Sequence, residues 1–201
     1  MNETVATVSP AVLVRLRAET RSEHDAIEQS LDLIGDDLTL SNYRHRLEQF
    51  YGFYQPLEDQ MRRLDNWLAP WLDAKERVKT PLLAQDLRTL GCKSLDSLPR
   101  CSHLPALESA AGYFGCMYVL EGSTLGGQVI SRHICEKLGV TSLSGGRFFE
   151  GYGRRTGFMW QQFRVAISEF ATTSDTQDQV VAAARSTFAM LNRWCQRRNT
   201  G

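Results

Sequence analysis

The stretch YVLEGSTLGGQVISRHI, from Tyr118 to Ile134, decides how the chain folds. It lies inside a longer segment, about 105–138, whose apolar residues recur at steps of three and four, which is typical of a helix. The same segment holds glycines that each cost a helix about 0.5 to 1 kcal/mol relative to alanine: Gly112, Gly115, Gly122, Gly126 and Gly127. The sequence SLSGG at 142–146 then ends the helical pattern.

Three of these glycines share one face of the predicted helix. Gly115, Gly122 and Gly126 stand at positions i, i+7 and i+11, so that face carries no side chains at these points. Such a face admits the close approach of a flat group. Alternatively, the glycines let a neighbouring helix pack closely or simply end the helix, and the spacing alone favours neither interpretation.

The rest of the chain also reads as helix, and no segment alternates with the period of a strand. A first helix with apolar steps through Leu31 follows a flexible tail at 1–9, with Ser9 and Pro10 at its start and Gly35 at its end. Further helices are predicted over about 41–64 with a kink at Pro56 and an end at Pro70, over 80–90 before Gly91, over 157–170, and from Ser174 with Gln177 in a capping box. Residues 92–105 read as a loop. We therefore predict one all-α domain over 1–201, a bundle of about six helices.

Composition excludes several classes of partner. The chain has 201 residues with 23 basic and 23 acidic side chains, so its formal net charge is zero. It therefore lacks the excess of basic residues that binding to nucleic acid or to a membrane surface requires. Five cysteines without metal-binding spacing favour reduced thiols in a cytoplasm. No signal peptide pattern and no apolar run of about 18 residues is visible, so we expect a cytoplasmic protein that is not inserted in a membrane.

His24 is the candidate metal ligand. It lies in the apolar stripe of the first predicted helix, with Glu28 one turn further on. A carboxylate there can accept one ring N–H and leave the other nitrogen free for a metal. Arg17, two turns before His24, can meet a carboxylate of a ligand. The alternatives are a core histidine with satisfied hydrogen bonds and an ordinary solvated arginine.

Other metal sites of helical proteins do not fit the sequence. A di-iron bundle requires paired Glu-x-x-His steps, but the residues three before the four histidines are Arg21, Asn42, Arg100 and Ile130. No HExxH occurs either. One histidine and a glycine-rich helix suggest an axial histidine with an open opposite face, as in haem proteins that bind a gas.

Two blocks of sequence resemble the haem oxygenase family. LRAETRSEHDAIE, from Leu16 to Glu28, resembles the first helix of these enzymes, and YVLEGSTLGGQVISRHI resembles their distal helix. MWQQFR at 159–164 and TFAMLNRW at 187–194 resemble the closing helices, so the resemblance covers nearly the whole chain. It is strongest to the bacterial branch that accompanies bacteriophytochromes. The resemblance implies a helical fold with haem between a proximal N-terminal helix and a glycine-kinked distal helix.

The resemblance also implies roles for single residues on the proximal side. His24 corresponds to the proximal iron ligand, and Glu28 corresponds to the acid that supports it. Arg17 and Arg164 match basic residues that meet the haem propionates. Phe188 is a further expected contact of the haem.

On the distal side, Gly122 and Gly126 correspond to glycines whose backbone lies against the haem and leaves room for dioxygen. Tyr118 and Gly127 are expected to contact the haem as well. Ser123 departs from the family, because several members have an aspartate there that orders distal water and steers dioxygen towards ring hydroxylation. A serine cannot supply that charge, and Arg132, Tyr118 and solvent are the candidate substitutes.

Trp160 is a second departure, since animal enzymes place a propionate-binding lysine at that position. The resemblance implies that haem b is both cofactor and substrate, and that dioxygen opens its ring to biliverdin IXα with release of carbon monoxide and ferrous iron. The catalytic set is then Gly122, Ser123 and Gly126.

Electrons are expected from an external ferredoxin or flavoprotein reductase, because the sequence shows no flavin or nicotinamide motif and no cluster of thiolate ligands. A bacteriophytochrome that accepts biliverdin is the partner that the branch implies. Two alternatives remain open. One is a haem carrier or gas sensor without turnover, and the other is a non-haem helical enzyme or interaction domain that shares only the fold.

Overall fold

The computed structural model describes residues 11–63 and 71–197. The predicted tail at 1–9, the cap at Ser9 and Pro10, and the helix end at Pro70 lie outside the described residues. The described helices are α1 (Ala11–Glu19), α2 (Arg21–Leu31), α3 (Leu40–Arg62), α4 (Thr80–Thr89), α5 (Ala110–Leu138), α6 (Arg147–Glu150), α7 (Thr156–Phe170) and α8 (Ser174–Cys195). No strand occurs in the described ranges, and the all-α prediction is confirmed.

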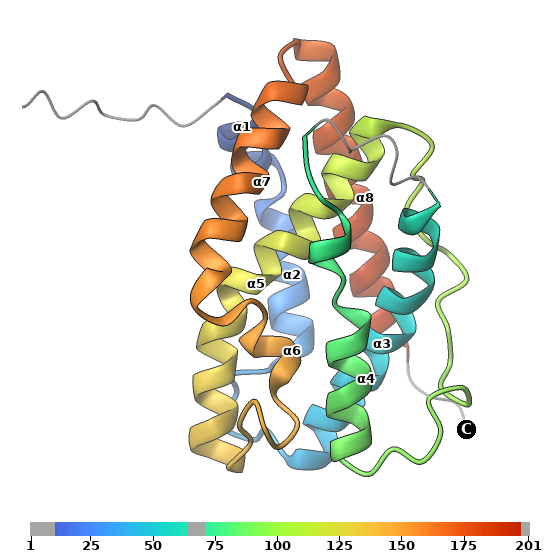
Figure 1. Ribbon diagram of the computed structural model, residues 1–201, viewed down its shortest axis with the longest axis vertical. Helices are drawn as coiled ribbons and strands as arrows, with labels where there is room; N and C mark the ends of the chain where they lie inside the picture. The colour runs from blue at the N-terminus through green and yellow to red at the C-terminus, as the bar shows by residue number, and fades with distance from the viewer. Residues whose placement is uncertain (1–10, 64–70, 198–201) are drawn as a thin grey trace, which may run out of the picture.

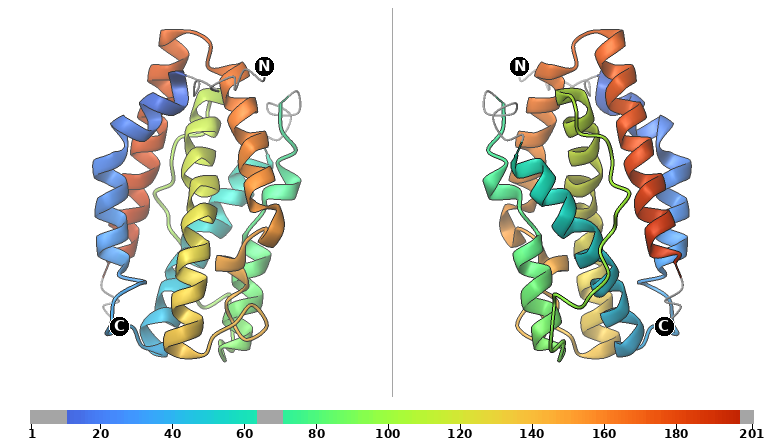
Figure 2. Two further views of the ribbon diagram at one scale, coloured as in Figure 1. Left: turned by 90° about the vertical axis from the view of Figure 1, so that its left-hand side faces the viewer. Right: turned by 90° about the vertical axis from the view of Figure 1, so that its right-hand side faces the viewer.

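The long helix α5 organises the bundle (Figure 1). Its most extensive contact is with α8, and α1 and α2 pack against α8 from the other side (Figure 2). The α3 helix packs against α4 and α8, and the short α6 lies against both α4 and α5. The largest fully buried side chains include Tyr43, Phe53, Tyr113, Phe114 and Phe163. None of the described helices is long and apolar enough to cross a membrane.

The first predicted helix is divided at Thr20, so the prediction of one continuous helix is wrong. The Thr20 hydroxyl donates to the Leu16 carbonyl at 2.7 Å, and its backbone leaves helical geometry at φ −106°, ψ 5°. A threonine that bonds back to the preceding turn often bends a helix. The end of the helix is also misplaced, because α2 ends when Asp32, rather than Gly35, adopts the left-handed conformation at φ 47°.

The later helices follow the predicted pattern with shifts at their starts. The α3 helix continues past Pro56, and α4 ends before Gly91, whose φ is +85°. The α5 helix begins only at Ala110, because the Ser109 side chain accepts from the Gly112 N–H and caps it there. The segment 105–109 is therefore not helical, contrary to the prediction.

The start of α8 is correct at Ser174, but the predicted capping box is not. The box is formed by Thr173 and Thr176, whose side chains each bond the other's backbone N–H. Gln177 instead donates from its side chain to the Ala171 carbonyl at 3.1 Å. The capping residue is the one whose backbone is extended just before the helix begins. The sequence does not show which of the neighbouring Ser and Thr residues adopts that backbone.

Candidate functional site

His24 lies on an uncovered side of α2, with 49% of its side chain exposed. Its Nδ1 lies 3.5 Å from Glu28 Oε2 and 3.8 Å from Asp25 Oδ1, and its ring meets Phe188 of α8 edge-on at 5.7 Å between centroids. This exposure excludes the alternative of a buried core histidine. Since both carboxylates lie at Nδ1, Nε2 is the ring atom that can take a metal.

The apolar stripe predicted around His24 is only partly buried. The α1 helix buries Val12, Leu13 and Leu16, whereas Ile27 is the one buried residue of α2. The half of the stripe that carries His24 therefore faces outwards.

Near the start of α5, a β-carbon at Gly112 would lie 2.7 Å from the Ala106 carbonyl oxygen, and the other four glycines of α5 fall into two pairs according to what a β-carbon would meet. At Gly115 it would lie 2.5 Å from a backbone oxygen of α8, and at Gly127 it would lie 2.7 Å from a backbone oxygen of α6. At Gly122 and Gly126 it would meet no atom within 4 Å. Close packing therefore explains the first pair, while the second pair borders open space.

The surroundings of the open pair are apolar as well as exposed. Leu125 is 41% exposed and Val129 is 60% exposed, although both lie within a turn of Gly126 on the same helix. Exposed apolar side chains next to bare backbone indicate a surface that binds an apolar partner.

The open part of α5 lies between two points where this helix contacts residues on either side of α2. Near one end, Tyr118 is hydrogen-bonded to Thr20, and near the other, His133 Nε2 lies 3.3 Å from the Gly35 carbonyl oxygen. His24 and Gly122 each follow the first of these contacts by four residues along their own helices. Figure 2 shows α2 and α5 apart from each other, with α8 packed against both. We therefore define the candidate site as the face of α2 that carries His24 together with segment 122–126 of α5.

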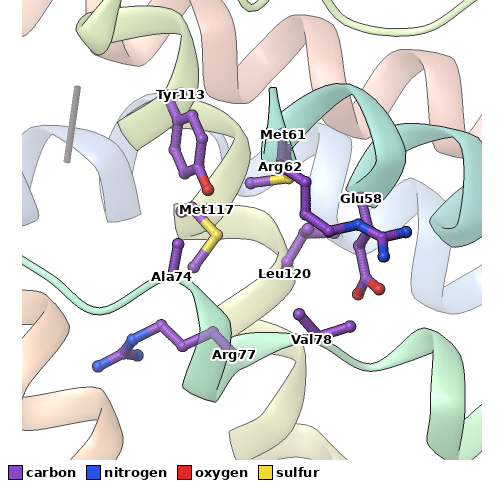
Figure 3. A pocket seen from close by; sticks show the side chains of 9 residues that line it. All are labelled: Glu58, Met61, Arg62, Ala74, Arg77, Val78, Tyr113, Met117 and Leu120. Carbon is purple, nitrogen blue, oxygen red and sulfur yellow. The ribbon is translucent and has the colours of Figure 1, made fainter. Parts of the chain in front are cut away.

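Two concave pockets of the described residues lie elsewhere. One is a cavity of about 20 Å³ that Glu58 and Arg77 line together with apolar side chains of α3 and α5 (Figure 3). This volume holds about one water molecule. The other, of about 310 Å³, is bordered by Trp71 and Phe158. Neither includes His24 or Gly126.

Tyr54 of α3 reaches the candidate site, although its place in the helical period marks it only as an apolar residue. Its hydroxyl lies 3.4 Å from Ser123 Oγ, which itself donates to the Leu120 carbonyl at 2.8 Å. Burial raises the pKa of the Tyr54 hydroxyl well above its usual value, so it stays protonated. Of the predicted substitutes for the family's aspartate, Arg132 is exposed and the Tyr118 hydroxyl is bonded to Thr20.

The two predicted anchor arginines lie on helices that pack against each other, α1 and α7. Arg17 is exposed, and it lies close enough to Tyr118 for its charge to act on that hydroxyl, whose pKa burial raises. Arg164 is half-buried and donates from Nη1 to Gln161 Oε1 at 3.2 Å. Trp160, in place of the family's lysine, packs against the Tyr118 ring at 6.1 Å between centroids. The contacts of both arginines with propionates stay predictions.

Comparison with known proteins gives one family. The family described as heme oxygenase matches residues 11–197. A heme oxygenase of Xanthomonas campestris pv. campestris (strain 8004) is 26% identical over 149 residues, which cover 73% of this chain and 84% of that protein.

Solved structures share the fold. Heme oxygenase from Leptospira interrogans matches with a TM-score of 0.76 at 20% identity, over 92% of this chain and 98% of that one. The NO- and CO-bound heme oxygenase from Neisseria meningitidis also has a TM-score of 0.76 at 20% identity, over 94% of both chains. The arrangement of helices described above is therefore that of these proteins.

Proposed function

The chain belongs to the haem oxygenase family, and from this premise we propose that it binds haem b at the candidate site and degrades it with dioxygen to biliverdin. Carbon monoxide and ferrous iron are the other products. The observation that carries the proposal is the pairing of an exposed His24 with the open backbone at Gly122 and Gly126.

The described residues fit a haem on three counts. His24 offers an imidazole nitrogen with its ring held from the other side by a carboxylate. Gly122 and Gly126 leave a flat surface on which a β-carbon would meet nothing within 4 Å. The apolar side chains beside them, Leu125 and Val129, are exposed and free to cover a porphyrin edge.

Each residue then has a separate task. His24 Nε2 binds the iron, while Glu28 accepts the Nδ1 proton and fixes the ring orientation. Bound haem supplies the iron that activates dioxygen and the ring that is oxidised. Ser123 Oγ gives its own proton to the Leu120 carbonyl and accepts from the protonated Tyr54 hydroxyl, so on the distal side it offers an acceptor that can hold a water molecule. Gly122 and Gly126 leave the space that dioxygen requires.

The edge of the haem is held by the remaining residues. Arg17 and Arg164 bind the propionates, and each charge-assisted contact contributes roughly 1.5 to 3 kcal/mol, which biases one in-plane orientation. Tyr118, Gly127 and Phe188 complete the pocket. For Gly127 the packing against α6 already accounts for the glycine, so its contact with haem is proposed from the family resemblance alone.

The wider setting is proposed from the same resemblance. The chain forms one domain in the cytoplasm and takes electrons from a separate ferredoxin or flavoprotein reductase. The product is the IXα isomer, which a bacteriophytochrome accepts as chromophore.

The test is a haem titration followed by aerobic turnover with a reductant and chromatography of the pigment. We expect a Soret band and a green product from the parent protein. His24→Ala should lose the normal haem spectrum and turnover, and added imidazole should restore part of the ligation. The matched control is His45→Ala, because His45 is also a helical histidine beside a carboxylate, with 38% of its side chain exposed and Nδ1 3.8 Å from Glu48.

Each outcome separates the alternatives. Parent spectra in His24→Ala would remove this histidine as the ligand. A parent protein that binds haem but forms no pigment would be a carrier or a gas sensor. A parent protein without a Soret band would share only the fold with the family.

A further inference from the structure

Glu121 directly precedes the open Gly122 in α5, but its side chain is buried, with only 1% of the residue exposed. Its carboxylate accepts a hydrogen bond from the Tyr152 hydroxyl at 2.6 Å and lies 3.3 Å from Lys79 Nζ. It also forms an ion pair with Arg77 Nη1. Adjacent helical residues point about 100° apart, so the buried Glu121 and the open Gly122 lie on different sides of the helix.

The three donors to Glu121 come from two separate parts of the chain, the segment before α4 and the segment after α6. Arg77 ends a short 3-10 turn before α4 and also donates from Nη2 to the Met159 carbonyl of α7 at 3.1 Å. Lys79 precedes α4 directly, and Tyr152 follows α6. The Lys79 ammonium lies 3.7 Å from the centroid of the Tyr152 ring, so the donors also contact each other. We call Glu121, Arg77, Lys79 and Tyr152 the buried ion cluster.

A second buried carboxylate fixes the cluster to α3. Glu58 accepts the backbone N–H of Lys79 at 2.7 Å and that of Thr80 at 3.0 Å. Figure 3 shows Glu58 and Arg77 on the border of the same small cavity. Two buried acids thus face two buried bases, and the charges balance.

Buried ion pairs of this kind are poor sources of net stability. Apolar residues of similar volume are often as stabilising, because removing charges from water offsets much of their attraction. Their hydrogen bonds are directional, however, and a carboxylate with three donors has one orientation in which all three are made. The cluster is therefore better suited to fixing geometry than to adding stability.

We infer that Glu121 is a positioning residue, which fixes the depth and rotation of segment 122–126 by joining α5 to the chain before α4 and after α6. Through this segment it sets the place of Gly122 and Ser123 opposite His24. The inference rests on the proposed function, in which that segment is the distal wall. A displacement of about 1 Å in such a wall is enough to lower turnover by about a hundredfold.

The first experiment uses the haem-free protein and measures amide hydrogen exchange over 120–127. The variants are Glu121→Gln, the charge-balanced pair Glu121→Gln with Lys79→Met, and Tyr152→Phe. We expect the charge-balanced pair to regain most of the melting temperature that Glu121→Gln loses, yet to exchange about tenfold faster than the parent at 120–127. Parent exchange rates at 120–127 in that pair would overturn the inference. Tyr152→Phe removes one donor without a charge, so it carries the same test if the other variants fail to fold.

The matched control is Gln49→Met. Gln49 is also a buried polar residue, but it joins α3 to the end of α8 by donating to the Cys195 carbonyl at 2.8 Å. We expect it to lower the melting temperature while leaving exchange at 120–127 unchanged. Faster exchange at 120–127 in this control would overturn the inference, because any loss of stability would then loosen the segment.

The second experiment separates binding from turnover. In the charge-balanced pair, haem affinity through His24 should stay close to the parent value, whereas turnover should fall by about tenfold or more. An equal loss of both, or no loss of turnover, contradicts a positioning role. If the parent protein neither binds nor degrades haem, the proposed function fails, but the exchange result still decides whether Glu121 holds the segment.

Discussion

The two groups of glycines in α5 predict opposite effects of the same substitution. Alanine at Gly122 or Gly126 adds a methyl group that meets no atom within 4 Å, so only the helix propensity changes. That change stabilises the haem-free protein by about 0.5 to 1 kcal/mol at each position, which raises the melting temperature by about 1 to 4 °C.

Gly115→Ala gains the same helix propensity but adds a clash. Its β-carbon would lie 2.5 Å from the Val180 carbonyl oxygen and 2.6 Å from the β-carbon of Ala183, and both atoms belong to a packed helix that has little room to move. Overpacking of this kind costs about 1 to 3 kcal/mol. Because the propensity gain cancels between the variants, Gly115→Ala should be less stable than Gly126→Ala by about that same 1 to 3 kcal/mol.

The assay is denaturant unfolding of the haem-free variants, followed by haem titration and turnover. The methyl group that stabilises the haem-free helix at Gly126 occupies the face that we propose for haem and dioxygen, so function should fall as stability rises. Gly126→Leu takes this further, and turnover should fail although haem still binds through His24. Equal destabilisation by Gly126→Ala and Gly115→Ala would refute the conclusion that Gly126 borders open space. Normal turnover in Gly126→Leu would remove segment 122–126 from the active site.

Three further predictions concern the hydrogen bonds, anchors and charges around this face. Ser123→Ala and Tyr54→Phe should each lower the yield of biliverdin. The double variant should lose no more yield than the worse single variant, because each substitution removes one end of the same contact. Additive losses of yield would contradict a shared role of the two hydroxyls. Arg17→Ala combined with Arg164→Ala should turn mainly biliverdin IXα into a mixture of isomers on chromatography, whereas an unchanged ratio would mean that other residues hold the propionates. Burial raises the pKa of Glu58 above its usual 4.5, so its contribution to stability is full below that pH and is lost as the pH rises through the folded pKa. The free energy of unfolding of the parent, relative to that of Glu58→Gln, should therefore fall from acidic to neutral pH. Parallel curves of the two free energies against pH would refute a raised pKa of Glu58.

Helices with a sustained apolar period could be predicted from the sequence, because the period is a local property that the bundle then uses. The points at which a helix bends or ends could not be predicted. Thr20 bonds back to Leu16 while the backbone bonds of the helix continue around it, so nothing in its neighbourhood distinguishes it from a helical threonine. Asp32 ends α2 in a left-handed conformation that the sequence assigned to Gly35, where no side chain opposes it.

Contacts in the candidate site could be predicted only where both residues lie on the same helix. His24 and Glu28 lie one turn apart, and their contact follows from helix geometry. Tyr54 and Ser123 are 69 residues apart in sequence, and the helical period counts Tyr54 only as an apolar residue. Glu121 gave a signal that went unused, since a charge inside an apolar run of a buried helix requires a partner.

The glycines show most clearly what a single sequence leaves undecided. Gly115, Gly122 and Gly126 share a face by spacing, and both interpretations of that face were open. Close packing of a neighbouring helix is confirmed at Gly115, whereas the approach of a flat group at Gly122 and Gly126 stays a proposal. The α8 helix packs on the face at Gly115, where its Val180 carbonyl approaches, and leaves it free at Gly122 and Gly126. The spacing shows which positions lack side chains, but only the neighbouring helix determines what approaches them.

The energetics of α5 indicate why an open pair of glycines persists in a helix that is otherwise closely packed. Gly115 and Gly127 allow contacts with α8 and α6 that offset their cost to the helix. Gly122 and Gly126 have no such contact, so the haem-free protein carries an uncompensated cost of about 1 to 2 kcal/mol. A ligand present at 100 times its dissociation constant stabilises the protein that binds it by about 2.7 kcal/mol, which exceeds this cost. The cost is therefore recovered only when a ligand occupies the face, while the buried ion cluster at Glu121 keeps the helix in place until it does.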